Sequence, residues 1–169
     1  MNWLTADLHF GHRNIIPYCK RPYPTVETMD DTLAANWRQV VSPGDTVYVL
    51  GDMGFIKDIP RLPGHIVLIG GNHDSSKLVN YWLQNKLIHE YIEGSIELAG
   101  VRLQHIPDDS NKPTYCGHVH EKWRMKGNCL NVGVDVWQYR PISQEQAYRF
   151  LAPTVLSKVR KTVHTLFGV

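Results

Sequence analysis

The sequence predicts a layered α/β fold in which all 169 residues belong to a single domain. Short apolar runs typical of buried strands alternate with amphipathic runs typical of helices early in the chain, and strand-like runs cluster later. Hydrophobic residues make up 43% of the chain and charged residues 20%, which is the composition of a globular protein. A chain of this length buries enough surface to fold without a disulfide scaffold.

The first half of the chain contains the expected strands of one sheet and the helices that cover it. The expected strands are 3–6, 46–50 and 65–69. Each is a continuous apolar run, and the last two are rich in the β-branched residues that buried strands favour. A helix is expected over 25–41, because apolar residues recur there at helical spacing and Thr25 can serve as its N-cap. A second helix is expected over 76–85.

The second half is expected to contain more strands than helices. Alternating hydrophobicity over 87–105, with turns at Gly94 and Gly100, predicts a β-meander. Two further short strands are expected at 114–116 and 130–132. Ser143 opens a helix with a capping-box pattern. An amphipathic helix is expected over 154–167, the least diagnostic part of the chain.

Charge and cysteine content exclude several classes of protein. The formal net charge is +2, which is too small to indicate a nucleic-acid surface by itself, so nucleic acid is not favoured as a partner. The three cysteines are widely spaced, unlike the disulfide framework of a secreted domain. The N-terminal residues do not resemble a signal peptide, and no segment is apolar enough to span a membrane. We therefore expect a cytoplasmic protein without a membrane partner. Its oligomeric state is expected to be a monomer or a homodimer.

Side chains that can bind metal recur at the ends of the expected strands. They are Asp7, His9, Asp52, Asn72, His73, His105, His118 and His120. In open α/β sheets, ligands bind beyond the carboxyl ends of the strands, where several loops converge. Carboxylate, amide and imidazole groups, with no thiolate among them, suit metals such as Mn, Fe, Co, Ni or Zn rather than a structural zinc.

Glycines accompany these residues. Gly51, Gly71 and Gly117 each directly precede a candidate ligand, where a sharp turn lets the backbone approach a metal closely. His118 and His120 are two residues apart, so on a strand-like segment their side chains would point to the same side. One of them could then serve each of two metals, or both could serve one metal.

The candidate residues form five motifs in a fixed order along the chain. They are Asp7-Leu8-His9, Gly51-Asp52, Gly71-Asn72-His73-Asp74, His105 and Gly117-His118-Val119-His120. In this order the motifs resemble those of the calcineurin-like metallophosphoesterase superfamily. The wider runs TADLHFGHRNIIPYCKRP, DTVYVLGD and NVGVDVW resemble a small, single-domain bacterial and phage branch of predicted phosphoesterases. The resemblance extends to about Phe150.

The resemblance implies a four-layer αββα sandwich of two mixed sheets flanked by helices, with a site for two divalent metal ions. Manganese is the first candidate, with Fe, Ni, Co or Zn as alternatives. Carried over by position, one metal would be held by Asp7, His9 and His120. The other would be held by Asn72, His105 and His118. Asp52 would bridge the two metals, and His73 would be the catalytic histidine near the leaving-group oxygen.

The departures from better-known members of the superfamily favour a phosphodiesterase over a protein phosphatase. Protein serine/threonine phosphatases carry Gly-Asp-x-x-Asp-Arg-Gly, in which the second aspartate pairs with the catalytic histidine and the arginine grips phosphate. Here Phe55 replaces that aspartate and Ile56 replaces that arginine, while Asp74 replaces the usual glutamate of the third motif. The expected substrate is a small phosphodiester, such as a nucleotide-type ester, hydrolysed by attack of a metal-bound hydroxide.

Two alternatives to this function remain open from the sequence. One is a phosphomonoesterase that acts on a small molecule or a protein, and the other is a metal-binding scaffold without catalysis. The scaffold is disfavoured because every ligand position and His73 are filled. A nuclease is disfavoured because the chain has no strongly basic patch.

Several residues near the motifs have both a functional and a structural interpretation. His12 and Arg13 follow the first motif closely and are candidates for binding the substrate phosphate, together with Asn72 and His73. Arg21 could serve likewise or be an exposed structural arginine. Asp135 could orient a ligand histidine or cap a loop.

Overall fold

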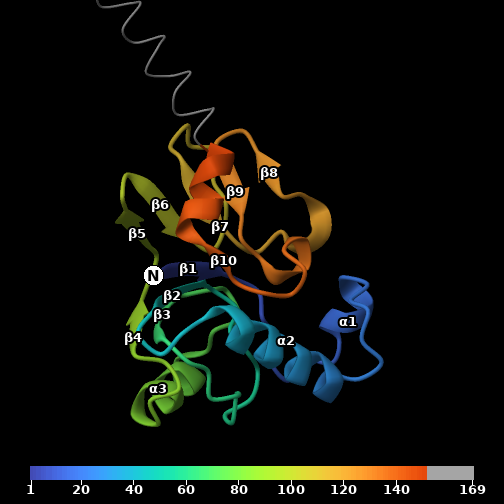
Figure 1. The fold of residues 1–169 in the computed structure, drawn as a ribbon. Helices are drawn as coiled ribbons and strands as arrows, with labels where there is room; N and C mark the ends of the chain where they lie inside the picture. The colour runs from blue at the N-terminus through green and yellow to red at the C-terminus, as the bar shows by residue number, and fades with distance from the viewer. Residues whose placement is uncertain (152–169) are drawn as a thin grey trace, which may run out of the picture.

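The structure, a computed structural model, describes residues 1–151. These residues form two stacked five-stranded mixed sheets flanked by helices, which confirms the predicted α/β sandwich (Figure 1). The amphipathic helix expected over 154–167 lies outside the described residues. No helix within residues 1–151 is both long and apolar enough to cross a bilayer.

The first sheet has the strand order β10-β1-β2-β3-β4. Its strands are β1 (Asn2–Thr5), β2 (Thr46–Leu50), β3 (His65–Ile69), β4 (Glu90–Ile92) and β10 (Ile142–Ser143). Strands β1 to β4 are parallel to one another, and β10 is antiparallel to β1. The three strands predicted early in the chain are therefore confirmed. Their carboxyl ends point to the same edge of the sheet.

Three helices accompany the first sheet and lie on its outer side in Figure 1. They are α1 (Ile15–Tyr18), α2 (Val26–Val40) and α3 (Ser76–Gln84). Both predicted helices are confirmed, and Thr25 caps α2 by accepting the N–H of Thr28 at 3.2 Å. Side chains of β2 point alternately to its two faces, and the two faces contribute to different cores. Val47 and Val49 join the core beneath the helices, and Leu50 joins the core between the sheets.

The second sheet has the strand order β5-β6-β7-β9-β8. Its strands are β5 (Ser95–Leu98), β6 (Val101–Gln104), β7 (Thr114–Cys116), β8 (Met125–Lys126) and β9 (Cys129–Asn131). Two short 3₁₀ helices, η1 (His120–Lys122) and η2 (Val134–Val136), lie in the loops. A helix over residues 144–151 packs on this sheet through Ala147 and Leu151, and the Ser143 hydroxyl caps it as predicted.

The predicted β-meander over 87–105 is wrong in one respect. Strand β4 pairs in parallel with β3 in the first sheet, whereas β5 and β6 form an antiparallel hairpin in the second. The chain crosses between the sheets at Gly94, which has φ 86°. Alternating hydrophobicity indicates which side of a strand is buried, but it carries no information about the strand's partner. The strand expected at 130–132 begins one residue earlier, at Cys129.

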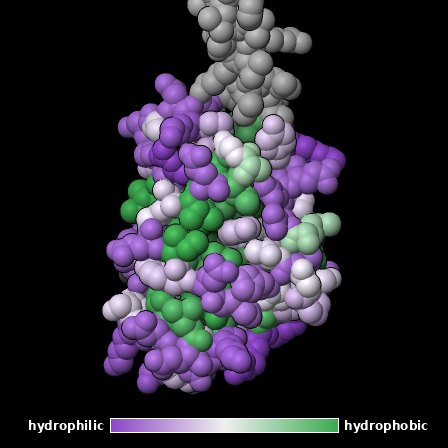
Figure 2. Space-filling view, turned by 90° about the vertical axis from the view of Figure 1, so that its left-hand side faces the viewer, coloured by the Kyte–Doolittle hydropathy of each residue, from purple (hydrophilic) through white to green (hydrophobic). Residues whose placement is uncertain are grey.

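The surface mixes apolar and polar side chains. Figure 2 shows one face on which hydrophobic residues gather in the middle and lower part, with hydrophilic residues around them. Exposed apolar side chains are normal on a folded protein because polar surface cannot cover it completely.

Substituting Thr25 tests the predicted start of α2. Thr25→Ala removes the side-chain oxygen that accepts the Thr28 N–H, so it should lower the free energy of unfolding by about 1 kcal/mol. Thr25→Ser keeps the acceptor and should cost much less. Urea denaturation of both variants measures the difference, and equal stability of the two would contradict this capping role.

Candidate metal centre

The loops that follow β1 and β2 are joined by their backbones. The N–H of Asp7 donates to the carbonyl of Gly51 at 3.1 Å, and the N–H of His9 donates to the carbonyl of Asp52 at 3.0 Å. On the second sheet, the N–H of Gly117 donates to the carbonyl of His105 at 3.0 Å. The candidate ligands are therefore positioned by main-chain contacts between loops that are distant in the sequence.

Asp74 joins the loop after β2 to the loop after β3. Its carboxylate accepts three backbone N–H groups, from Asp52 at 2.8 Å, Met53 at 2.9 Å and Gly71 at 2.9 Å. Burial raises the pKa of Asp74, and the three N–H groups act against that rise. The sequence analysis noted Asp74 only as a departure from a motif. The structure shows that it holds the backbone of a candidate ligand in place.

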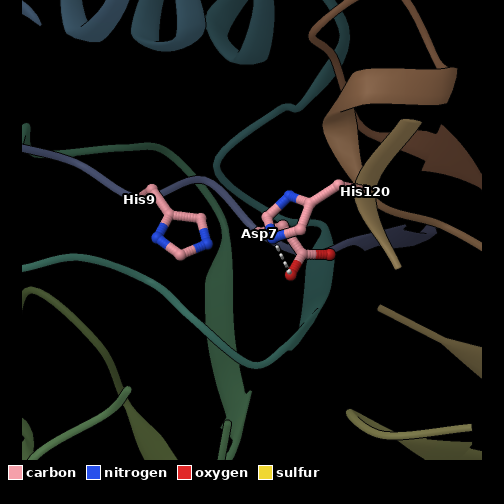
Figure 3. Close-up of side chains that lie close together, drawn as sticks. All are labelled: Asp7, His9 and His120. Carbon is pink, nitrogen blue, oxygen red and sulfur yellow. Dashed lines mark ion pairs between the residues drawn. The ribbon is translucent and has the colours of Figure 1, made fainter. Parts of the chain in front are cut away.

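The first group of candidate ligands consists of Asp7, His9 and His120. One ligand atom of each lies within 4.8 Å of the others. Figure 3 shows the three side chains together, with the ion pair between Asp7 Oδ1 and His120 Nε2 at 3.9 Å marked. Asp7 is 0% exposed and His9 is 1% exposed, so two of the three are fully withdrawn from water.

The second group surrounds Asn72. Its Oδ1 lies 2.9 Å from His105 Nε2 and 3.0 Å from His118 Nδ1. Ligand atoms of Asp7, Asp52 and His105 also lie within 4.8 Å of one another. The structure thus brings together the carboxylate, amide and imidazole groups that the sequence placed at separate strand ends.

Asp52 lies between the two groups. Its Oδ2 is 3.5 Å from His9 Nε2, which belongs to the first group, and 3.4 Å from His105 Nε2, which belongs to the second. Its other oxygen accepts the backbone N–H of His73 at 3.0 Å. A single carboxylate oxygen therefore faces one histidine from each group.

The hydrogen bonds of His105 favour positive charge at the site. Its Nδ1 lies 2.8 Å from the carbonyl oxygen of Leu50, which can only accept, so Nδ1 carries a proton. In the neutral ring, Nε2 then has a lone pair that faces oxygens of Asn72 and Asp52. A cation or a second proton between these acceptors would satisfy all of them. Burial opposes that proton, but the hydrogen bond to Asp52 and the charges of Asp7 and Asp52 raise the pKa of His105 to about 9.

Two further observations agree with a cation at this place. His9 Nε2 is buried and has no hydrogen-bond partner among residues 1–151. Burial raises the pKa of Asp7 to about 6, because its charge has little solvation and is close to Asp52. Both groups would be satisfied as ligands of a divalent cation. The donor set therefore fits two metal ions with mixed oxygen and nitrogen ligands.

The backbone is strained at the candidate ligands. Five of them have φ in the left-handed region: Asp7 at 57°, His9 at 56°, Asp52 at 56°, His118 at 70° and His120 at 50°. Non-glycine residues rarely adopt this conformation, which costs on the order of 1–3 kcal/mol each and persists where the surrounding structure imposes it. Such strain is typical of functional sites.

His118 and His120 do not lie on a strand-like segment, so that expectation is wrong. The left-handed φ of His118 ends the extended backbone after β7, and His120 begins η1. The rings diverge as a result: that of His118 lies 5.2 Å from that of His105, and that of His120 lies 5.1 Å from that of His9. Of the two arrangements left open, the structure places one histidine in each group.

Arg21 supports the first group, a role that the sequence analysis did not give it. It is 4% exposed, and it forms a bidentate ion pair with Asp135 at 2.8 and 2.9 Å. The same guanidinium donates to the carbonyl of Asp7 at 2.7 Å, and Asp135 accepts from His120 Nδ1 at 3.0 Å. Both earlier interpretations of Arg21, a phosphate binder or an exposed arginine, are therefore wrong. Asp135 orients a candidate ligand histidine, one of its two interpretations.

Of the remaining candidates, His12 and His73 lie beside the ligands, whereas Arg13 does not bond to them. His12 Nδ1 is 3.3 Å from His9 Nδ1, and the ring of Phe55 lies 4.2 Å from that of His12 and 5.5 Å from that of His73. His73 is exposed, beside the ligands. Arg13 is exposed, and within residues 1–151 it forms no hydrogen bond or ion pair with the site.

Gly51 allows a sensitive test of the geometry. A methyl group there would overlap the ring of His105, whereas a methyl group at Gly94 would meet nothing within 4 Å. The two glycines have nearly the same φ, 84° and 86°, so Gly51→Ala and Gly94→Ala carry the same backbone strain. Mn²⁺ bound at this centre should raise the Tm of Gly94→Ala but not that of Gly51→Ala. An equal rise in both variants would contradict this account of His105.

Comparisons with known proteins agree with the fold but name no activity. No family model matches the chain. The uncharacterized protein MJ1445 of Methanocaldococcus jannaschii is 33% identical, with 97% of each chain covered. The gene 66 protein of Mycobacterium phage L5 is 29% identical, with 86% of this chain and 91% of that protein covered. The crystal structure of AQ665 from Aquifex aeolicus, a protein of unknown function, is similar with a TM-score of 0.69 and 25% identity, over 89% of this chain and 98% of that one. The chain therefore belongs to the same protein family as MJ1445.

Proposed function

We propose that the chain is a metal-dependent phosphodiesterase of the calcineurin-like metallophosphoesterase superfamily, acting on a small phosphodiester. The observation that carries this proposal is the position of Asp52, whose Oδ2 faces His9 Nε2 at 3.5 Å and His105 Nε2 at 3.4 Å. A carboxylate shared by two sets of ligands can hold two cations close together, and a two-metal hydrolase needs two cations close together. The protein would work as a monomer or homodimer.

The residues would divide between the two cations as their contacts suggest. The first cation would be held by Asp7, His9 and His120. The second would be held by Asn72, His105 and His118. Asp52 would bridge them. When bound, two such cations neutralise the charge of a phosphoester and lower the pKa of a water molecule, and this donor set suits Mn, with Fe, Ni, Co or Zn as alternatives.

His73 is positioned to donate a proton to the leaving-group oxygen. Its backbone N–H is fixed by Asp52 Oδ1 at 3.0 Å, and its ring lies 5.9 Å from that of His9. The imidazole is exposed, so a substrate can reach it. A histidine with this access can act as a general acid.

The surroundings of His73 favour a diester over a monoester. A monoester carries about two negative charges near neutral pH and is best gripped by arginine, whereas a diester carries one charge. The guanidinium of Arg21 is bound to Asp135 and to the Asp7 carbonyl, so it is not free to bind phosphate. The wall beside His73 is instead the aromatic ring of Phe55. An apolar wall beside the proton donor accommodates the leaving-group ester of a diester and offers no cation to a dianion.

Metal removal and substrate choice test the proposal together. Protein stripped with a chelator should not hydrolyse bis(4-nitrophenyl) phosphate, and added Mn²⁺ should restore hydrolysis. The restored enzyme should show a higher kcat/KM for this diester than for 4-nitrophenyl phosphate. Full turnover by protein shown to be metal-free by elemental analysis would overturn the two-metal site. A clear preference for the monoester or for a phosphopeptide would replace the diesterase with a phosphatase.

Substitution of His73 tests its role as the proton donor. His73→Ala should bind metal normally but lose roughly 10²–10⁴-fold in turnover on an alkyl diester, and less on a nitrophenyl ester, whose leaving group needs no proton. His65→Ala is a matched control, because His65 lies at the opposite end of β3 and pairs with Glu90. Loss of metal from His73→Ala would make His73 a ligand and contradict the assignment.

A further inference from the structure

A cleft of about 450 Å³ opens beside the second group of candidate ligands. It is lined by Gly70, Asn72, Tyr91, Glu93, Ser95 and His105, among others. The cleft lies where the chain crosses from β4 in the first sheet to β5 in the second. Its volume is within the range of sites that bind small molecules, about 300–1,000 Å³. A substrate bound at the metal centre would therefore have this space directly beside it.

Three polar side chains of this cleft are free to bind a ligand. Within residues 1–151, the side chains of Tyr91, Glu93 and Ser95 form no hydrogen bond or ion pair, and all three residues are exposed. The ring of Tyr91 lies over Gly70, where an added methyl group would be 2.5 Å from the tyrosine hydroxyl. Burial and the charge of Glu93 raise the pKa of Tyr91, so its hydroxyl keeps its proton and can donate.

The charge of the cleft limits which chemical groups it can bind. No lysine or arginine lines it, and Glu93 is its acidic residue. A carboxylate only accepts hydrogen bonds, so it repels a second phosphate group and suits hydroxyl donors. An acidic residue that accepts from ribose hydroxyls is a known solution in nucleotide-binding sites. The cleft therefore fits an uncharged group with neighbouring hydroxyls.

We propose that this cleft binds the alcohol half of the phosphodiester and selects a group with a vicinal diol, such as a ribose or a glycerol. Glu93 accepts the hydroxyl groups, and Tyr91 and Ser95 bind beside it. This inference rests on the proposed phosphodiesterase function, because the diester's phosphate must lie at the metal centre for its alcohol half to enter the cleft.

Three diesters with the same leaving group and the same charge test the proposal. They are the 4-nitrophenyl phosphates of methanol, of glycerol and of uridine, the last joined through its 5′ oxygen. The wild-type enzyme loaded with Mn²⁺ should hydrolyse the glyceryl and uridyl esters with a kcat/KM about tenfold or more above that of the methyl ester. A preference for both assigns the diol itself, and a preference for the uridyl ester alone assigns the nucleoside.

Variants of the cleft should change this preference without changing the chemistry. Glu93→Ala should lower kcat/KM for the diol esters by about tenfold, and Tyr91→Phe by roughly three- to tenfold, with little effect on the methyl ester. Ser95→Trp fills the cleft and should raise KM for the diol esters alone. Glu97→Ala is the matched control for Glu93→Ala, because Glu97 is an exposed glutamate on β5, the strand of Ser95, and pairs with Lys112 outside the cleft.

The outcomes separate this inference from the proposed function. If the methyl ester is hydrolysed but Glu93→Ala and Ser95→Trp leave the ratio between the esters unchanged, the cleft does not bind substrate, while the phosphodiesterase function stands. If none of the three esters is hydrolysed with any of the candidate metals, the proposed function fails and this inference fails with it.

Discussion

Two carboxylates that are withdrawn from water, Asp7 and Asp52, impose the main constraint on this structure. Their exposures are 0% and 1%, and a buried negative charge is costly unless a positive charge or several donors balance it. The protein supplies some of that balance through the backbone N–H groups of His118 and His73. The imidazoles around them have lone pairs as well, so divalent cations, as in the proposed function, would complete the balance.

Contacts from the rest of the site hold Asp7 and Asp52 in their strained backbone conformations. The left-handed backbone at Asp7 and Asp52 is stabilised by contacts from other elements. Asp74 accepts the N–H of Asp52, and Arg21 donates to the carbonyl of Asp7. The same Arg21 is tied to His120 through Asp135, so one buried guanidinium orients both a carboxylate and an imidazole.

The environment around the candidate metal centre differs on its two sides. Near His73 the wall is formed by the ring of Phe55, which carries no charge. Near Asn72 and His105 the cleft carries hydroxyl groups and one carboxylate, with no lysine or arginine in its lining. Under the proposed function, the cations would bind phosphate, and uncharged and acidic side chains would select among esters. Such a division would favour a singly charged diester over a doubly charged monoester.

The sequence by itself determined the α/β architecture, the helix caps at Thr25 and Ser143, and the set of polar residues at the strand ends, because local periodicity and capping preferences act over a few residues. Only the tertiary structure decided which strands pair, and it put β4 and β5 in different sheets. It also placed His118 and His120 in different groups of candidate ligands. It brought Arg21 into contact with the carbonyl of Asp7. These features depend on left-handed backbone angles and buried contacts between distant segments, which no local pattern of residues encodes.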